Sequence, residues 1–113
     1  MIAAQDTTKV KLLIELASQD IYQDQTLARA HAQQALDISV DQNYRRGIGM
    51  AYRYIGLSYH FGSALDSARY YYEKSGPFFK SPKDQGWSYF NIATILQIST
   101  QYDSTEYLSL IHI

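Results

Sequence analysis

Three histidines, His31, His60 and His112, are the residues best suited to bind a metal or to transfer protons. They lie far apart in the sequence. None has a second histidine or a carboxylate four residues later, the spacing that places two ligands on one face of a helix. The 113 residues contain no cysteine, which excludes thiolate ligands and disulfides. We therefore expect neither a metal site nor a cofactor.

Motifs for nucleophilic catalysis or for phosphate binding would indicate an enzyme. The sequence contains no Gly-x-Ser-x-Gly elbow and no glycine-rich phosphate loop. The segment Gly47-Ile48-Gly49 lies inside a helical pattern with no strand before it. We expect a chain that is not an enzyme.

Basic and aromatic clusters could recognise an anion or a nucleic acid. Arg45 and Arg46 with Arg53 could contact a phosphate or a carboxylate, and the three tyrosines at 70–72 could stack on bases. Ten Lys and Arg residues are offset by eleven Asp and Glu residues, which gives a net charge of -1. A solvated helix face for the arginines and core packing for the tyrosines are the favoured interpretations. We expect no binding of nucleic acid or of a membrane by this segment.

The elements that position these residues are predicted to be helical. Apolar residues recur at helical spacing over five segments, 9–22, 27–40, 44–61, 64–75 and 83–99. Gly62-Ser63 and Gly76-Pro77 are the predicted stops, with Gly76 in the left-handed conformation. A turn at Thr100-Gln101 precedes a short sixth helix that begins near Tyr102. No segment alternates long enough to predict a strand, so the expected class is all-α.

Predicted inward faces follow from the same spacing. They comprise Val10, Leu13, Leu16, Ala17 and Ile21 in the first helix; Leu27, Ala28, Ala32, Ala35, Leu36 and Ile38 in the second; Ala51, Tyr52, Ile55, Gly56 and Tyr59 in the third; Leu65, Ala68 and Tyr72 in the fourth; and Tyr89, Ile92, Ala93 and Leu96 in the fifth.

A repeated motif links these helices. Tyr52-x-x-Ile55-Gly56-x-x-Tyr59 is followed by Ala68-x-x-x-Tyr72-x-x-Ser75. The first half recurs 37 residues later as Tyr89-x-x-Ile92-Ala93-x-x-Leu96. The second half occurs 40 residues earlier as Ala28-x-x-x-Ala32-x-x-Ala35. Small residues at 56 and 68 would let two helices cross closely.

This motif resembles the tetratricopeptide repeat family. The long period and the segments at 6–17 and 64–75 are similar to the sensor regions of bacterial histidine kinases and transcription regulators. The resemblance implies a right-handed solenoid of antiparallel helical hairpins, with about three repeats at 9–40, 44–76 and 83–107, the last incomplete. Residues 1–8 are then an N-terminal lead.

The resemblance also implies a peptide groove lined by the first helix of each hairpin. The positions that it assigns to the groove are Met50, Arg53, Tyr54, Leu57, His60 and Phe61 in the second repeat, and Trp87, Phe90, Asn91, Thr94, Gln97 and Ile98 in the third. Asn91 would hold a peptide backbone by two hydrogen bonds. Alternatively, sequence outside this chain covers part of that face. Ile14 and Ser18 stand where carboxylate-clamp members of the family have Lys and Asn, which argues against a receptor for C-terminal carboxylates.

The two ends of the chain are considered separately from the helices. The last six residues, 108–113, resemble the translated end of a transposon used in sequencing adapters, and they are predicted to be non-native; alternatively, they complete the sixth helix. Ala3-Ala4-Gln5 could be the remains of an export site, so a cytoplasmic and a periplasmic location both stay open.

The expected function is that of a non-catalytic protein or peptide interaction module, a fragment of a bacterial signalling protein. The alternative is a structural spacer or an oligomerisation segment. A nucleic-acid regulator would need a basic domain outside this chain. Because the end of a repeat array exposes an apolar face, self-association through the fifth helix around Ile92 and Leu96 is also expected.

Overall fold

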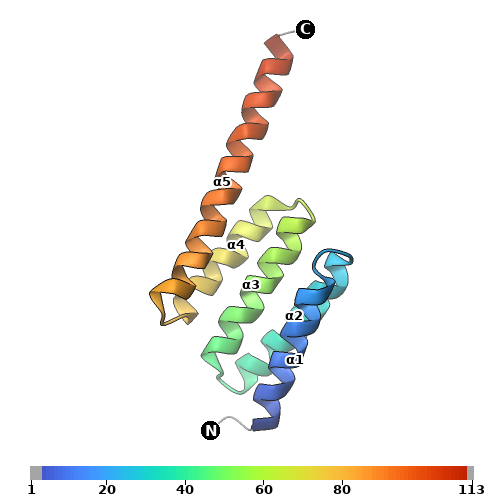
Figure 1. Ribbon diagram of the computed structural model, residues 1–113, viewed down its shortest axis with the longest axis vertical. Coiled ribbons are helices and arrows are strands. Elements are labelled where there is room, and N and C mark those ends of the chain that lie inside the picture. Colours follow the sequence, from blue (N-terminus) through green and yellow to red (C-terminus); the bar gives the residue numbers. More distant parts are fainter. Residues whose placement is uncertain (1–3, 112–113) are drawn as a thin grey trace.

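The chain folds entirely into helices over the residues that the structure describes (Figure 1). The computed structural model describes the backbone of residues 4–111 and the side chains of residues 6–97. Its elements are α1 (Ala4–Asp20), α2 (Gln25–Asp41), α3 (Arg45–Phe61), α4 (Leu65–Ser75), the 3-10 turn η1 (Gly76–Phe78) and α5 (Pro82–Ile111). No strand occurs between residues 4 and 111, and the prediction of an all-α class is confirmed.

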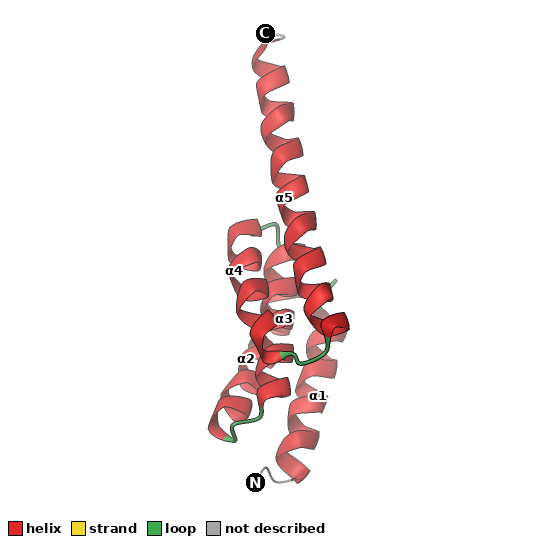
Figure 2. Cartoon of the chain, turned by 90° about the vertical axis from the view of Figure 1, so that its left-hand side faces the viewer, coloured by secondary structure: helices red, strands yellow, loops and turns green. Residues whose placement is uncertain are grey.

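Consecutive helices run antiparallel and pack against each other, and α1 also contacts α3. Figure 2 shows α2 and α4 on one side of the molecule and α1 and α5 on the other. In Figure 1, α1, α3 and α5 lie in front, so the helices form two layers. The molecule is elongated, with extents of 62 × 29 × 18 Å, because the C-terminal half of α5 projects beyond the other helices.

Short turns with a left-handed residue end α2 and α3. The N–H of Tyr44 donates to the carbonyl of Ser39 at 2.8 Å, and Asn43 between them has a φ of 53°. The N–H of Ala64 donates to the carbonyl of Tyr59 at 2.8 Å, and Ser63 has a φ of 66°. Both are Schellman endings, in which a left-handed residue lets the chain reverse and satisfies the last helical carbonyls.

The structure corrects the predicted role of Gly76. This residue has a φ of -52° and a ψ of -51°, so it is right-handed and continues the helical path into η1. Pro77 stands within η1, where the missing N–H costs nothing. The segment after α4 therefore tightens into a 3-10 turn before it becomes extended at Phe79.

Small residues line the contacts between helices. The alanines with no exposed surface are Ala17, Ala28, Ala32, Ala35, Ala51 and Ala68. A Cβ added to Gly56 would stand 2.8 Å from the Tyr72 ring and 3.3 Å from the Ala68 carbonyl oxygen. The predicted crossing of the third and fourth helices at Gly56 and Ala68 is thus observed between α3 and α4.

The sequence repeat has a counterpart in burial. Ala28, Ala32 and Ala35 of α2 are buried, and so are the residues 40 positions later, Ala68, Tyr72 and Ser75 of α4. Farther along, Ser39 and Phe79 are also both buried at this interval. The two helices therefore present equivalent faces to their neighbours.

The C-terminal region differs from the prediction. Residues 82–111 form one continuous helix, so the expected turn at Thr100-Gln101 and the separate sixth helix are wrong. Neither glycine nor proline occurs between residues 87 and 111, and nothing local interrupts the backbone hydrogen bonds of α5. Whether residues 108–113 are native stays a prediction; residues 112–113 lie outside the described residues.

The inward face of α5 also differs. The buried residues are Ser88 and Ile95, whereas Tyr89 and Leu96 are 66% and 43% exposed. Ala93 is exposed as well, and Ile92 is half-buried. The buried face of α5 therefore lies one residue earlier than predicted. Trp87 of α5 packs against Arg53 and Tyr72, and this contact sets the rotation of the helix.

Smaller differences occur near the N-terminus. α1 begins at Ala4, five residues before the predicted start at Lys9, because no residue from Ala4 to Thr8 breaks a helix. Leu16 and Leu27, predicted to face inward, are each 42% exposed.

Replacing Ala68 with leucine should overpack the crossing of α3 and α4. Three extra carbon atoms would be inserted beside Gly56, where Ala68 has no exposed surface. We expect a loss of about 1 to 3 kcal/mol in the free energy of unfolding, measured by urea denaturation. Ala30→Leu, at an exposed site of α2, is the matched control and should change stability by less than about 0.5 kcal/mol. Equal stability of the two variants would contradict the crossing.

Candidate functional site

Arg53 connects α3 to α5 through its side chain. Its guanidinium carbon is 4.1 Å from the centroid of the Trp87 ring and 4.3 Å from that of Phe79. Nη2 donates a hydrogen bond of 3.0 Å to the backbone carbonyl of Asp84, and Nη1 is 3.7 Å from the Met50 sulfur. Only 8% of Arg53 is exposed. This predicted groove residue is therefore part of the packing between helices.

Burial sets the electrostatics of Arg53. It lowers the pKa of the guanidinium from its ordinary value, while the charge of Asp84 opposes the shift by favouring the protonated form. Asp84 also accepts a hydrogen bond of 3.3 Å from Arg46. Asp84 thus connects a buried arginine to a surface arginine through its backbone carbonyl and its carboxylate.

His60 is the second predicted groove residue that is engaged within the chain. Its Nδ1 lies 3.0 Å from the hydroxyl of Tyr72, and its ring stacks on Phe61 with a centroid distance of 5.8 Å. Burial lowers the pKa of His60 and raises that of Tyr72. Both groups are therefore held in their neutral forms at neutral pH.

The other predicted groove residues differ in their surroundings. Four of them are half-buried and pack against the core: Met50, Tyr54, Leu57 and Trp87. Phe61 contacts Tyr22 edge-on at 4.8 Å. Phe90 is 71% exposed, Gln97 is exposed, and Asn91 and Thr94 bond to carbonyls of their own helix. The side chain of Ile98 lies outside the described residues.

Two neighbouring hollows occur at the N-terminal end of α3. The larger, of about 470 Å³, is lined by Asn43, Tyr44, Arg45, Arg46, Phe78, Phe79, Lys80, Ser81 and Asp84. The smaller, of about 230 Å³, is lined by Val10, Lys11, Ile14, Tyr44, Arg46, Gly47 and Met50. Tyr44 and Arg46 line both, so the hollows adjoin. We call the two together the basic cleft.

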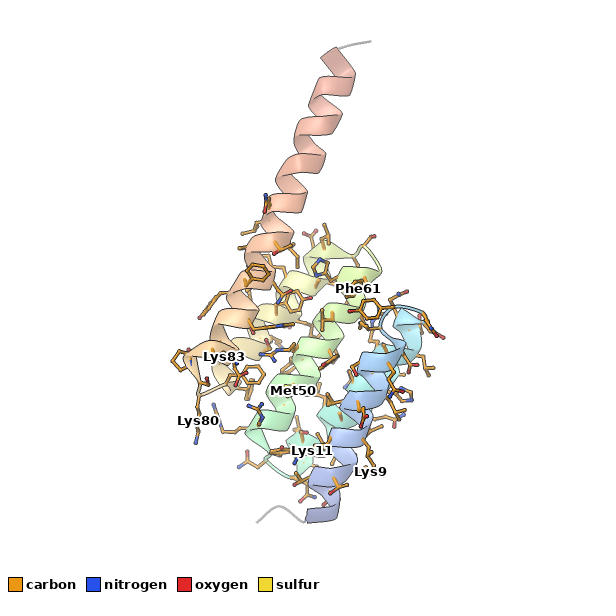
Figure 3. All side chains as sticks on the ribbon, in the orientation of Figure 1. Lys9, Lys11, Met50, Phe61, Lys80 and Lys83 are labelled. Atoms are coloured by element: carbon orange, nitrogen blue, oxygen red, sulfur yellow. The ribbon has the colours of Figure 1, made fainter. Side chains whose placement is uncertain are left out.

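Charge in the basic cleft is unbalanced. Its cations are Lys11, Arg45, Arg46 and Lys80, and its one carboxylate is Asp84. Figure 3 shows Lys9 and Lys11 on one side of Met50 and Lys80 and Lys83 on the other. The N-terminal ends of α3 and α5 add positive backbone dipoles at Arg45 and Pro82. A positive surface with apolar side chains at its base favours an acidic, partly apolar ligand.

The base of the basic cleft depends on glycine. A Cβ at Gly49 would stand 3.0 Å from both Phe78 and Phe79, and one at Gly47 would meet Ser39 and Tyr44. These close contacts account for the segment Gly47-Ile48-Gly49 inside α3: the missing side chains let the aromatic rings lie against the helix.

The sequence interpretation found only part of this cleft. Met50 was among the predicted groove residues, and Arg45 and Arg46 were considered as anion contacts. Phe78 and Phe79 lie between the predicted helices 64–75 and 83–99 and were assigned no role, although two adjacent aromatic residues after Pro77 are a signal of packing. Phe79 is only 2% exposed.

Among the described residues, no three His, Asp or Glu side chains come together in a way that would hold a metal ion. His31 contacts Asp20 at 3.0 Å, and His112 lies outside the described residues. Within the part of the chain that the structure describes, no helix is both long and apolar enough to cross a bilayer.

Removing the Arg53 side chain should destabilise the fold. Arg53→Ala would leave a void between the rings of Phe79 and Trp87 and would remove the hydrogen bond to Asp84. We expect the free energy of unfolding to fall by about 2 to 4 kcal/mol in urea denaturation. The control is Arg69→Ala, which breaks an exposed ion pair with Glu73 and should cost less than about 1 kcal/mol. Similar losses in both variants would mean that Arg53 does not hold α5.

The lowered pKa of His60 predicts a dependence of stability on pH. The unfolded chain takes up this proton near pH 6.5, before the folded chain does. The contribution of His60 to the free energy of unfolding is therefore complete above about pH 6.5 and is lost as the pH falls. In urea denaturation between pH 7.5 and pH 5, wild type should lose more stability than His60→Gln. His31→Gln keeps the contact between His60 and Tyr72 and should retain the effect of His60. A loss in His60→Gln as large as in wild type would contradict this assignment.

Comparison with protein-family models, with curated proteins and with solved structures finds no match to this chain.

Proposed function

We propose that this chain is a non-catalytic protein-interaction module that binds an acidic segment of a partner protein in the basic cleft. The observation that carries the proposal is the joining of two hollows at Tyr44 and Arg46, with four cations around an apolar base. Carboxylates of a peptide would pair with Arg45, Arg46 or Lys80, and its aliphatic side chains would contact Tyr44 and Met50.

The resemblance to tetratricopeptide repeats supports this proposal. Under that interpretation the helices form a right-handed solenoid, and the layer of α1, α3 and α5 is the side on which such repeats bind peptides. The shared burial of α2 and α4 at an interval of 40 residues is consistent with a repeat array. A place in a bacterial signalling protein follows from the same resemblance.

The binding mode differs from the one implied by the motif alone. Arg53 and His60 contact other residues of the chain, so their role is to hold the helices in place. The peptide would instead contact Arg46, Met50 and Lys80. The alternative function is a structural spacer or an oligomerisation segment, in which the basic cleft would have no ligand.

A peptide selection tests the proposal. A random library of displayed 12-residue peptides is selected on the chain, and the enriched peptides are measured by fluorescence anisotropy. We expect enrichment of Asp and Glu next to aliphatic residues, and affinity that falls as salt rises. Arg46→Glu should weaken binding at least about tenfold, because it reverses a charge shared by both hollows.

Arg69→Glu on α4 is the matched control, since it introduces the same charge change at an exposed arginine of the other layer. It should leave affinity within about twofold of wild type at 150 mM salt. Failure to enrich any peptide, or equal binding by Arg46→Glu, would reject the basic cleft as a site and favour the spacer.

A further inference from the structure

The outer face of α5 is apolar and exposed. Tyr89 and Phe90 are 66% and 71% exposed, and Ala93 lies between them and Leu96, which is 43% exposed. Ser88 and Ile95, on the opposite side of the helix, are almost completely buried. The outer face of α5 comprises Gly86, Tyr89, Phe90, Ala93, Leu96 and Gln97. Exposed aromatic residues grouped in this way are typical of an interaction surface.

The chain itself shows how such a face is covered elsewhere. On α3, the stripe Tyr52, Gly56 and Tyr59 has the same large-small-large order as Tyr89, Ala93 and Leu96. The antiparallel helix α4 covers it: the rings of Tyr52 and Tyr59 lie 6.2 and 5.6 Å from that of Tyr71. Gly56 brings the two backbones close at Tyr72. This pattern therefore accepts an antiparallel helix.

Gly86 gives an independent indication of close approach. A Cβ added there would meet nothing within 4 Å, so the fold of a single chain makes no use of the missing side chain. Glycine within a helix is costly, and an exposed one needs a reason. It lies seven residues before Ala93, which is two helical turns, and the two small residues share one side of the helix along the outer face.

Charge and symmetry identify the occupant. Residues 85–102 contain no charged side chain, so two copies of this face would not repel each other. In an antiparallel pair centred on Ala93, Tyr89 of one copy comes level with Gln97 of the other, and Phe90 with Leu96. The face is thus complementary to itself, as a twofold contact requires. α5 also lies at the edge of the molecule, where a second copy can reach it (Figure 1).

We propose that a second copy of this chain binds the outer face of α5 through its own α5, antiparallel and with the two Ala93 residues at the crossing. The pair buries the exposed aromatic rings and gives Gly86 a packing role. This dimer is independent of the basic cleft, so peptide binding and pairing can succeed or fail separately.

Sedimentation equilibrium between 1 and 500 µM gives the first test. We expect a reversible dimer of wild type, and Ala93→Glu should raise its dissociation constant at least about tenfold by placing two carboxylates at the crossing. Ala30→Glu, the same change at an exposed site of α2, should leave the constant unchanged. A wild type that stays monomeric, or a dimer that Ala93→Glu does not weaken, overturns the proposal.

Cysteine cross-linking then tests the register, because the chain has no cysteine of its own. Under mild oxidation Ala93→Cys should form a covalent dimer, whereas Ala30→Cys should not. A mixture of Phe90→Cys and Leu96→Cys chains should yield mostly mixed dimers. Faster linkage of either variant with itself than with the other would overturn the antiparallel arrangement.

Discussion

The close approach of neighbouring helices is the constraint on which the rest of the structure depends. Alanines at 17, 28, 32, 35, 51 and 68 have no exposed surface, and Gly56 accepts the ring of Tyr72. Small residues at these points let backbones come near enough for tight packing, so large side chains are needed only beside the crossings. The many tyrosines occupy that space, and Tyr52, Tyr59 and Tyr71 form a chain of ring contacts between α3 and α4.

The contact between α3 and α5 is built differently from the others. A buried guanidinium between two aromatic rings takes the place of small residues, and its charge is offset by the Asp84 carbonyl and by the nearby carboxylate. Arginine suits this position because its planar group stacks on rings and keeps its proton even when burial opposes it. The same contact fixes Phe79 and Asp84, which line the basic cleft. One side chain therefore links the packing of α5 to the shape of the cleft.

The two proposed surfaces have contrasting chemistry and separate locations. The basic cleft combines cations with apolar residues at the start of α3, whereas residues 85–102 of α5 are uncharged. A dimer formed through α5 would carry two clefts. Two linked clefts would bind a partner with two acidic segments more tightly than one cleft alone, because the second contact forms within the complex. A partner with two acidic segments would then favour the dimer, whereas a single peptide would bind each cleft as it binds the monomer.

The sequence by itself determined the helical class, the approximate positions of the first four helices, and the crossing at Gly56 and Ala68, because helical periodicity and side-chain size are local properties. Only the tertiary structure decided which face of α5 is buried, that Arg53 is inside, and that Lys11, Arg46 and Lys80 share one cleft. Those features depend on contacts between different helices and turns, which the periodicity of one segment does not encode. The continuation of α5 past Thr100, in contrast, was within reach of the sequence, because no glycine or proline between residues 87 and 111 breaks the helix.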